Sequence, residues 1–184
     1  MNKSSIIFLT GPGGVGKSTT GKILADFMQN KFIDLDEVFC EQIAHIGKFI
    51  REKGYSEYCH TNSKLLESII MENRMNTVIA LSSGFLTYNN PNGLAQQNYN
   101  LLCAHGKIVL LLPSKSLGRA EKIVVKRQLG RRFGLTEEGE LKKFRERYAE
   151  YQKYNYDLTI FSTKSPSEIA QLMETKLKKI MPEY

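Results

Sequence analysis

The stretch GPGGVGKS, residues 11–18, decides the fold of this 184-residue chain. It follows the apolar run IIFL at residues 6–9 and leads into TTGKILA at residues 19–25, so we expect it to join a strand to a helix. The spacing G-x-x-x-x-G-K-S is that of the phosphate-binding P-loop. Its glycines allow a tight turn in which consecutive backbone N–H groups point at phosphate oxygens, and the helix adds the positive end of its dipole. The sequence therefore predicts a site for a nucleotide's phosphates rather than a chance glycine-rich loop.

The side chains at the end of this loop predict the chemistry of the site. Lys17 is expected to reach the β- and γ-phosphates of ATP, and the Ser18 hydroxyl is expected to contact Mg²⁺. The residues that we expect to bind ATP are Gly13, Gly14, Val15, Gly16, Lys17, Ser18, Thr19 and, from a basic segment further along the chain, Arg127.

Composition fits one globular domain with a sizeable core, since 41% of the residues are hydrophobic and 24% are charged. No apolar run approaches the roughly 20 residues of a membrane helix, and none near the N-terminus has the length of a secretion signal. The three cysteines are far apart and odd in number, which fits neither a disulfide framework nor a zinc site. We therefore expect a cytoplasmic protein with reduced thiols and no membrane partner.

The net charge of +7 is concentrated late in the chain. Residues 115–132 hold seven basic residues and one acid, Glu121. Such a segment could bind nucleic acid, or its arginines could converge on a polyphosphate. We favour the second interpretation because the P-loop already supplies a phosphate, and we predict no nucleic-acid partner.

A second informative stretch is FIDLD at residues 32–36. Asp34 and Asp36 follow a short strand, and ligands of open α/β sheets bind at the carboxyl ends of the strands. If the segment is extended, the spacing of two points both carboxylates the same way. One could then hold Mg²⁺ through water while the other accepts a hydroxyl proton. The alternative is that an aspartate caps the next helix, and Asp36 could do so.

Apolar runs and turn residues predict an alternation of strands and helices. Strands are expected at residues 4–10, 32–33, 77–81, 107–112 and 157–161, and helices at 16–30, 36–51, 55–75, 94–104, 114–129, 136–154 and from 165 to before Pro182. This order favours a parallel sheet covered by helices on both faces. The small residues Ser82, Ser83 and Gly84 come directly after a strand, where they would let a ligand approach the backbone.

The order of these parts resembles the shikimate kinase family, within the P-loop enzymes that are similar to nucleoside monophosphate kinases. The resemblance rests on the G-x-x-x-x-G-K-S-T run, the F-x-D-x-D run, the small-residue turn at 82–84, an arginine pair at 131–132 and an R-x-x-x-Y run at 147–151. It implies an α/β three-layer P-loop kinase fold whose five parallel strands have the order 2-3-1-4-5. It further implies one domain over residues 1–184, a mobile lid at about 129–140, and ATP-dependent phosphoryl transfer to a small metabolite with Mg²⁺.

The resemblance also implies roles for single residues. Asp34 is similar to the family's magnesium-side aspartate, and Asp36 is similar to the aspartate that binds the reacting hydroxyl. Arg132, or Arg131, resembles the lid arginine, and Arg147 resembles an arginine that grips the substrate carboxylate. The implied catalytic residues are therefore Lys17, Asp36 and Arg132.

The acceptor half of the site departs from the family's pattern. Cys59 stands where the family has an arginine that binds the shikimate carboxylate, and Ser82 and Ser83 replace two glycines of a triplet. A hydrogen bond to a charged group contributes about 1.5–3 kcal/mol, so loss of that arginine would weaken shikimate binding roughly 10- to 150-fold. The residues that we expect to contact the acceptor are Asp36, Cys59, Ser82, Ser83, Gly84 and Arg147.

These observations predict an ATP-dependent small-molecule kinase that is shikimate-kinase-like, with shikimate as one candidate acceptor. Two alternatives stay open: a nucleoside or nucleotide kinase, and a nucleotide-binding protein without transfer activity. We expect a monomer or a weak dimer.

Overall fold

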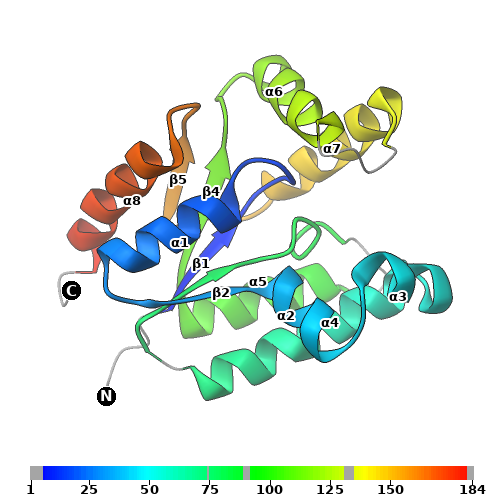
Figure 1. The fold of residues 1–184 in the computed structure, drawn as a ribbon, viewed down its shortest axis with the longest axis horizontal. Coiled ribbons are helices and arrows are strands. Elements are labelled where there is room, and N and C mark those ends of the chain that lie inside the picture. The colour runs from blue at the N-terminus through cyan, green and yellow to red at the C-terminus, as the bar shows by residue number, and fades with distance from the viewer. Residues whose placement is uncertain (1–5, 74, 89–91, 131–134, 182–184) are drawn as a thin grey trace.

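The structure, a computed structural model, describes residues 6–73, 75–88, 92–130 and 135–181. Its centre is a sheet of five parallel strands in the order β2-β3-β1-β4-β5 (Figure 1). The strands are β1 Ile6–Thr10, β2 Lys31–Asp34, β3 Thr77–Ala80, β4 Gly106–Leu112 and β5 Leu158–Phe161. The sheet confirms the predicted strand order; residues 4 and 5 of the first predicted strand lie outside the described residues.

Eight helices accompany these strands in the described part of the chain. They are α1 Lys17–Phe27, α2 Leu35–Gln42, α3 Ile46–Lys53, α4 Tyr55–Glu72, α5 Leu94–His105, α6 Leu117–Leu129, α7 Glu137–Tyr151 and α8 Pro166–Ile180. Two of these helices have side-chain N-caps of the usual kind: the Gly139 amide donates to Thr136 Oγ1 at 3.2 Å at the start of α7, and Ser165 and Glu168 form a capping box at α8.

One predicted helix is wrong. The sequence favoured a single helix over residues 36–51, but the chain breaks at 43–45 into α2 and α3. The break lets the Phe49 ring pack edge-on against the buried Phe39 ring, with 5.3 Å between centroids. The apolar side chain of Ile43 is 38% exposed at the break. Long-range packing here outweighs helical periodicity.

The central strand β1 explains the three-layer architecture. Its residues Ile6 to Leu9 are all fully buried, and they alternate between two core clusters. Ile6 and Phe8 face the layer of α2, α4 and α5, while Ile7 and Leu9 face the layer of α1 and α8 (Figure 1). A strand buried on both faces reads as a continuous apolar run, as this one does.

Strand order also decides which loops meet. All five strands are parallel, so the loops after β1, β2 and β3 leave the same edge of the sheet. Ala80 of β3 pairs with Leu9 of β1 on one side and with Asp34 of β2 on the other. The segment after β3 therefore starts between the P-loop and the aspartate segment.

The helices α6 and α7 form a pair beyond the sheet edge, tied by Arg145, whose Nε and Nη2 donate to Glu121 at 2.5 and 3.1 Å. The predicted lid at about 129–140 falls between and at the ends of these helices, and its residues 131–134 lie outside the described residues.

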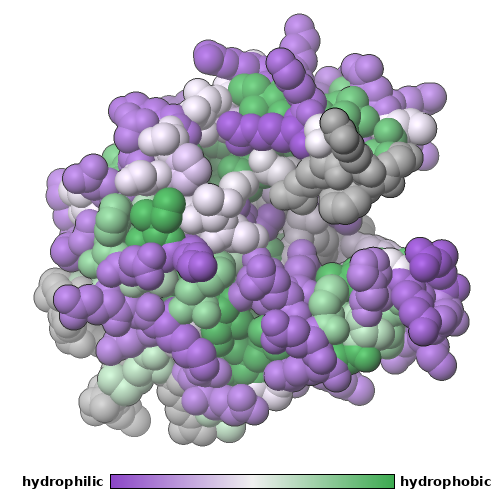
Figure 2. All heavy atoms as spheres, in the orientation of Figure 1, coloured by the Kyte–Doolittle hydropathy of each residue, from purple (hydrophilic) through white to green (hydrophobic). Residues whose placement is uncertain are grey.

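In the space-filling view the surface is hollowed between the α6–α7 pair and α3 (Figure 2). Among the described residues, no helix is long and apolar enough to cross a membrane.

Candidate active site

The P-loop joins β1 to α1, as predicted, and its shape requires glycine. Gly11 has φ +139°, and a side chain there would collide with the Leu111 carbonyl of β4. Gly16 has φ +100° and caps α1 without a side-chain hydrogen bond. The first turn of α1 contains no acidic residue, so the positive end of its dipole is not opposed there. The loop and helix therefore suit an anionic group.

Lys17 begins α1 and folds back along the loop. Its Nζ donates to the Gly11 carbonyl at 2.9 Å and to the Pro12 carbonyl at 3.1 Å. These bonds hold the ammonium against the loop backbone, on the segment where nucleotide phosphates are expected. Ser18 and Thr19 follow on the exposed side of the first turn of α1, where their hydroxyls are accessible.

The end of α6 lies against the same loop. Arg127 Nη1 is 3.4 Å from the Gly14 carbonyl, a long hydrogen bond from the residue that we expected beside ATP. Gln128 packs on Gly13 and Gly14 and is buried, and its Oε1 has no hydrogen-bond partner among the described residues. The sequence did not predict this contact of Gln128 with the P-loop, because no local pattern distinguishes Gln128 from the other polar residues of α6. Arg131 and Arg132 lie outside the described residues.

The two aspartates after β2 take different positions. Asp34 is the N-cap of α2: its Oδ1 accepts hydrogen bonds from the Asp36 amide at 3.0 Å and the Glu37 amide at 3.4 Å. The cap is therefore Asp34 and not Asp36. Asp36 lies in the first turn of α2, so the assumption of an extended segment with both carboxylates pointing the same way is wrong.

Asp36 is the centre of a hydrogen-bond network. Ser82 Oγ donates to Asp36 Oδ1, and the Tyr58 hydroxyl is 3.4 Å from the same oxygen and 3.3 Å from Ser82 Oγ. Asn62 Nδ2 donates to Ser82 Oγ at 2.9 Å. Burial, and secondarily the charge of Asp36, hold the pKa of Tyr58 well above its usual range. The phenol therefore stays protonated and can act as a donor. All of these bonds to Asp36 are on Oδ1.

A second network holds Arg147, which reaches from α7 to the segment after β3. Its Nη1 donates to Ser83 Oγ at 2.8 Å and its Nη2 to the Tyr55 hydroxyl at 3.2 Å. The Tyr151 hydroxyl, one helical turn on, donates to the Ser83 carbonyl at 2.7 Å. A side chain at Gly84 would collide with the Tyr55 hydroxyl. The guanidinium is thus fixed beside the segment that we expected to border the acceptor.

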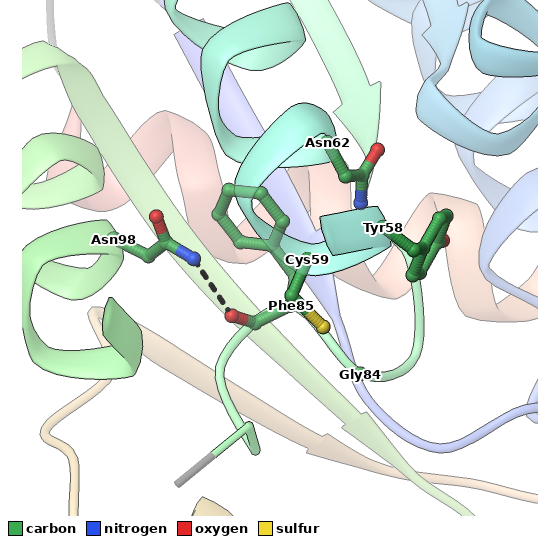
Figure 3. A pocket seen from close by; sticks show the side chains of 6 residues that line it. All are labelled: Tyr58, Cys59, Asn62, Gly84, Phe85 and Asn98. Carbon is green, nitrogen blue, oxygen red and sulfur yellow. Dashed lines mark hydrogen bonds between the residues drawn. The ribbon is translucent and has the colours of Figure 1, made fainter. Parts of the chain in front are cut away.

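Cys59 is a buried residue of α4, next to Tyr58 of the Asp36 network. It lines a small cavity of about 10 Å³, room for about one water molecule, whose lining residues are Tyr58, Cys59, Asn62, Gly84, Phe85 and Asn98 (Figure 3). Asn62 Oδ1 is buried without a hydrogen-bond partner among the described residues. Burial raises the pKa of the Cys59 thiol to about 11, so the side chain carries no charge at neutral pH.

The raised pKa predicts a labelling pattern. Cys40 and Cys103 are exposed, whereas Cys59 is buried. With a thiol pKa of about 11, only about one Cys59 in a thousand is the reactive thiolate at pH 8. Iodoacetamide should therefore alkylate Cys40 and Cys103 in the native protein, and Cys59 only after unfolding or as the pH rises toward 11. Mass spectrometry of digested peptides measures each site, and equal labelling of all three at pH 8 would contradict the buried position.

The structure thus brings together Asp36, Ser82, Ser83, Gly84 and Arg147, as the sequence suggested, and places Cys59 behind them. Sequence reasoning missed the tyrosines at 55 and 58. Their only signal was their place at the start of α4, and the contacts join residues up to 92 positions apart.

A five-stranded parallel sheet of this order, with a P-loop after the central strand β1 and a fixed carboxylate after the edge strand β2, defines a P-loop kinase. The family model for shikimate kinase matches residues 13–180. The shikimate kinase of Chlorobium phaeobacteroides is 31% identical over 138 residues, 74% of this chain and 68% of that protein. The shikimate kinase of Prochlorococcus marinus is 29% identical over 182 residues, 96% of this chain and 88% of that one.

Solved structures agree on the fold. The shikimate kinase of Acinetobacter baumannii in complex with shikimate superimposes with a TM-score of 0.73 at 22% identity, covering 97% of this chain and 94% of that one. The chain belongs to the shikimate kinase family, and it is an ATP-dependent small-molecule kinase.

Proposed function

We propose that this kinase transfers the γ-phosphoryl group of ATP to a hydroxyl of a small metabolite bound between Asp36 and Arg147. The observation that carries the proposal is the fixed carboxylate of Asp36, at the same sheet edge as the P-loop. A carboxylate there can accept a hydrogen bond from the acceptor hydroxyl and take its proton during transfer. The bonds from Ser82 and Tyr58 fall on Oδ1, which directs the acceptor to Oδ2.

The nucleotide half is assigned to the P-loop and its neighbours. We propose that ATP contacts Gly13, Gly14, Val15, Gly16, Lys17, Ser18, Thr19 and Arg127, and that Arg132 closes over the phosphates from a lid at about 129–140. Lys17 and Arg132 would then stabilise charge on the transferring group.

Mg²⁺ fits the oxygen donors of this half. It is bound in such enzymes through one or two protein oxygens, several waters and the nucleotide phosphates, and when bound it neutralises phosphate charge. The described residues contain no cluster of three or more His, Cys, Asp or Glu side chains that could hold a metal alone. We assign it to the accessible Ser18 hydroxyl and, through water, to Asp34, whose cap bonds from the Asp36 and Glu37 amides are both on Oδ1.

The acceptor half is assigned to Asp36, Cys59, Ser82, Ser83, Gly84 and Arg147. It offers one guanidinium and an uncharged thiol, so it grips a carboxylate at one position only. Shikimate, the ligand of the Acinetobacter protein, is one candidate. Other hydroxylated acids with a single carboxylate suit the same groups.

One observation favours a second function, ATP binding without transfer. Both charged residues that we expect to contact the acceptor molecule already have hydrogen-bond partners within the chain. Asp36 accepts from Ser82 and Tyr58. Arg147 donates to Ser83 and Tyr55. An acceptor would have to bind on the remaining edges of these groups. A nucleoside or nucleotide kinase remains the other alternative.

We also propose that the protein acts in the cytoplasm as a monomer or weak dimer, without nucleic acid or membrane partners. Its three cysteines are free thiols, which suits a reducing compartment.

The experiment that tests the function measures ADP formation with a panel of shikimate, sugar acids, uncharged polyols and nucleosides. We expect turnover of at least one hydroxylated acid. Replacing Arg147 with methionine should raise KM for that acid roughly 10- to 150-fold, because a charged hydrogen bond is lost, and leave KM for ATP unchanged. The control is Lys142→Met, which removes an exposed positive charge from the same helix.

The outcomes separate the candidates. Turnover of nucleosides alone would support the nucleoside kinase, and tight ATP binding without any turnover would support the binding protein. Equal effects of the two variants would remove Arg147 from the acceptor site.

A further inference from the structure

A groove on the β4–β5 side of the molecule is separate from the site described above. It lies between the end of α7 and the strands β4 and β5, and it has a volume of about 460 Å³. That size is within the 300–1,000 Å³ of ordinary small-molecule sites. Its described lining includes no residue of the P-loop and none of the residues assigned to the acceptor. We call it the aromatic groove, after Tyr148, Tyr151, Tyr154, Tyr156 and Phe161, which line it.

The walls of the aromatic groove are held in place by contacts outside it. The Tyr154 ring packs on the Tyr99 ring with 4.7 Å between centroids. The Tyr156 hydroxyl donates to the Tyr151 carbonyl at 2.9 Å, and the Tyr151 hydroxyl donates to the Ser83 carbonyl at 2.7 Å. Rings that are already fixed lose little conformational freedom when a ligand binds, so the groove is preorganised for a flat apolar body.

The charge that lines the aromatic groove is positive. Lys115 is the one charged residue among its described lining, and its Nζ lies 5.6 Å from the centre of the Phe161 ring. The acids next to the groove in sequence have other partners: Glu150 pairs with Lys153 and Asp157 with Lys107, each at 2.7 Å. The ammonium is therefore available for a negative group of a ligand that rests on the rings.

We infer that the aromatic groove binds a small anionic molecule with a flat, aromatic body, its ring against the tyrosines and its carboxylate or other anion at Lys115. The amides of Gln152 and Asn155, which also line the groove, offer it further hydrogen-bond donors and acceptors. This site is independent of the acceptor that the kinase uses, so the inference stands apart from the proposed function.

The test uses two probes that share a ring system and differ in one substituent, a carboxylate in 2-naphthoate and a neutral hydroxymethyl group in 2-naphthylmethanol. Their affinities for the full chain are measured by isothermal titration calorimetry. We expect naphthoate to bind about 2- to 5-fold more tightly than the alcohol, because only naphthoate forms an ion pair with the exposed Lys115. Saturating ATP should not displace it.

Two matched variants locate the charge. Lys115→Met should reduce the naphthoate affinity to that of the alcohol, whereas Arg119→Met, which removes an exposed cation four positions further on and outside the described lining, should preserve the difference between the two probes. Phe161→Ala should weaken both probes alike, because it removes a ring from the wall. Both methionine substitutions are at exposed positions, so folding is not expected to change.

Four results would overturn the inference. Equal affinity of the two probes for the native chain, or equal loss in the Lys115 and Arg119 variants, would mean that Lys115 does not select an anion. Displacement of naphthoate by ATP would place the probe in the nucleotide site. Sedimentation showing a dimer that naphthoate dissociates would make the groove a contact between two copies of this chain.

Discussion

Replacing Lys17 with methionine should lower kcat by about 100-fold or more while the fold stays intact. Removing one donor that stabilises developing charge typically costs 10²–10³ in kcat, and we propose Lys17 as such a donor to the transferring group. Methionine is also unbranched, is only one atom shorter than lysine, and leaves the loop glycines unchanged. The measurement is the rate of ADP formation with saturating ATP and the best acceptor of the panel.

The matched control for this variant is Lys22→Met, an exposed lysine on the same helix. It should retain native activity. Thermal unfolding midpoints of both variants should match that of the native chain. Retained transfer in the Lys17 variant would show that the P-loop lysine is not part of the reaction.

Replacing Asp36 with asparagine should lower kcat by about 10²–10⁴, the usual contribution of a positioned acid–base group. Asparagine keeps an oxygen that can accept the hydrogen bonds from the Ser82 and Tyr58 hydroxyls, so the network can persist, but it removes the negative charge that we propose to receive the proton of the acceptor hydroxyl. KM for ATP should stay within about twofold, because Asp36 is assigned to the acceptor alone. The measurement is steady-state kinetics with each substrate varied in turn.

The control for this second variant is Asp26→Asn, which neutralises an exposed carboxylate on α1. Its kinetics should equal those of the native enzyme. If the Asp36 variant raised KM for ATP and left kcat unchanged, the carboxylate would belong to the nucleotide half and not to the acceptor.

The conformation of the P-loop and the sheet could be predicted because their signals are local. The P-loop needs glycine where φ is positive, as at Gly11 and Gly16, and the strand before it is apolar on both faces because both faces are buried. Such signals lie in consecutive residues. They were sufficient for the strand order once the family resemblance was added.

The break between α2 and α3 and the capping role of Asp34 could not be predicted, because each depends on where the chain goes next. Phe49 reaches Phe39 only if the helix stops at residues 43–45. A helical pattern of apolar residues gives no information on such a contact.

The hydrogen bonds around Asp36 and Arg147 could not be predicted from the sequence for a related reason. The Tyr55 hydroxyl meets Arg147 across 92 residues, and the Tyr58 hydroxyl meets Asp36 across 22. Sequence identifies the departures from the family at Cys59, Ser82 and Ser83. It does not reveal that the serine hydroxyls bond to the aspartate and arginine that the family pattern assigns to a substrate.

Strand β3 lies between the P-loop strand β1 and the aspartate strand β2. The segments proposed to contact the acceptor are therefore distinct from the P-loop in sequence. Mutations after β2 and β3 can change what is phosphorylated without touching the loop that holds the phosphate donor. Enzymes with this sheet can therefore change their acceptor through single substitutions in these segments while the P-loop stays unchanged. This chain has Ser82 and Ser83 where the family pattern has glycines, while its P-loop has every residue of the G-x-x-x-x-G-K-S motif.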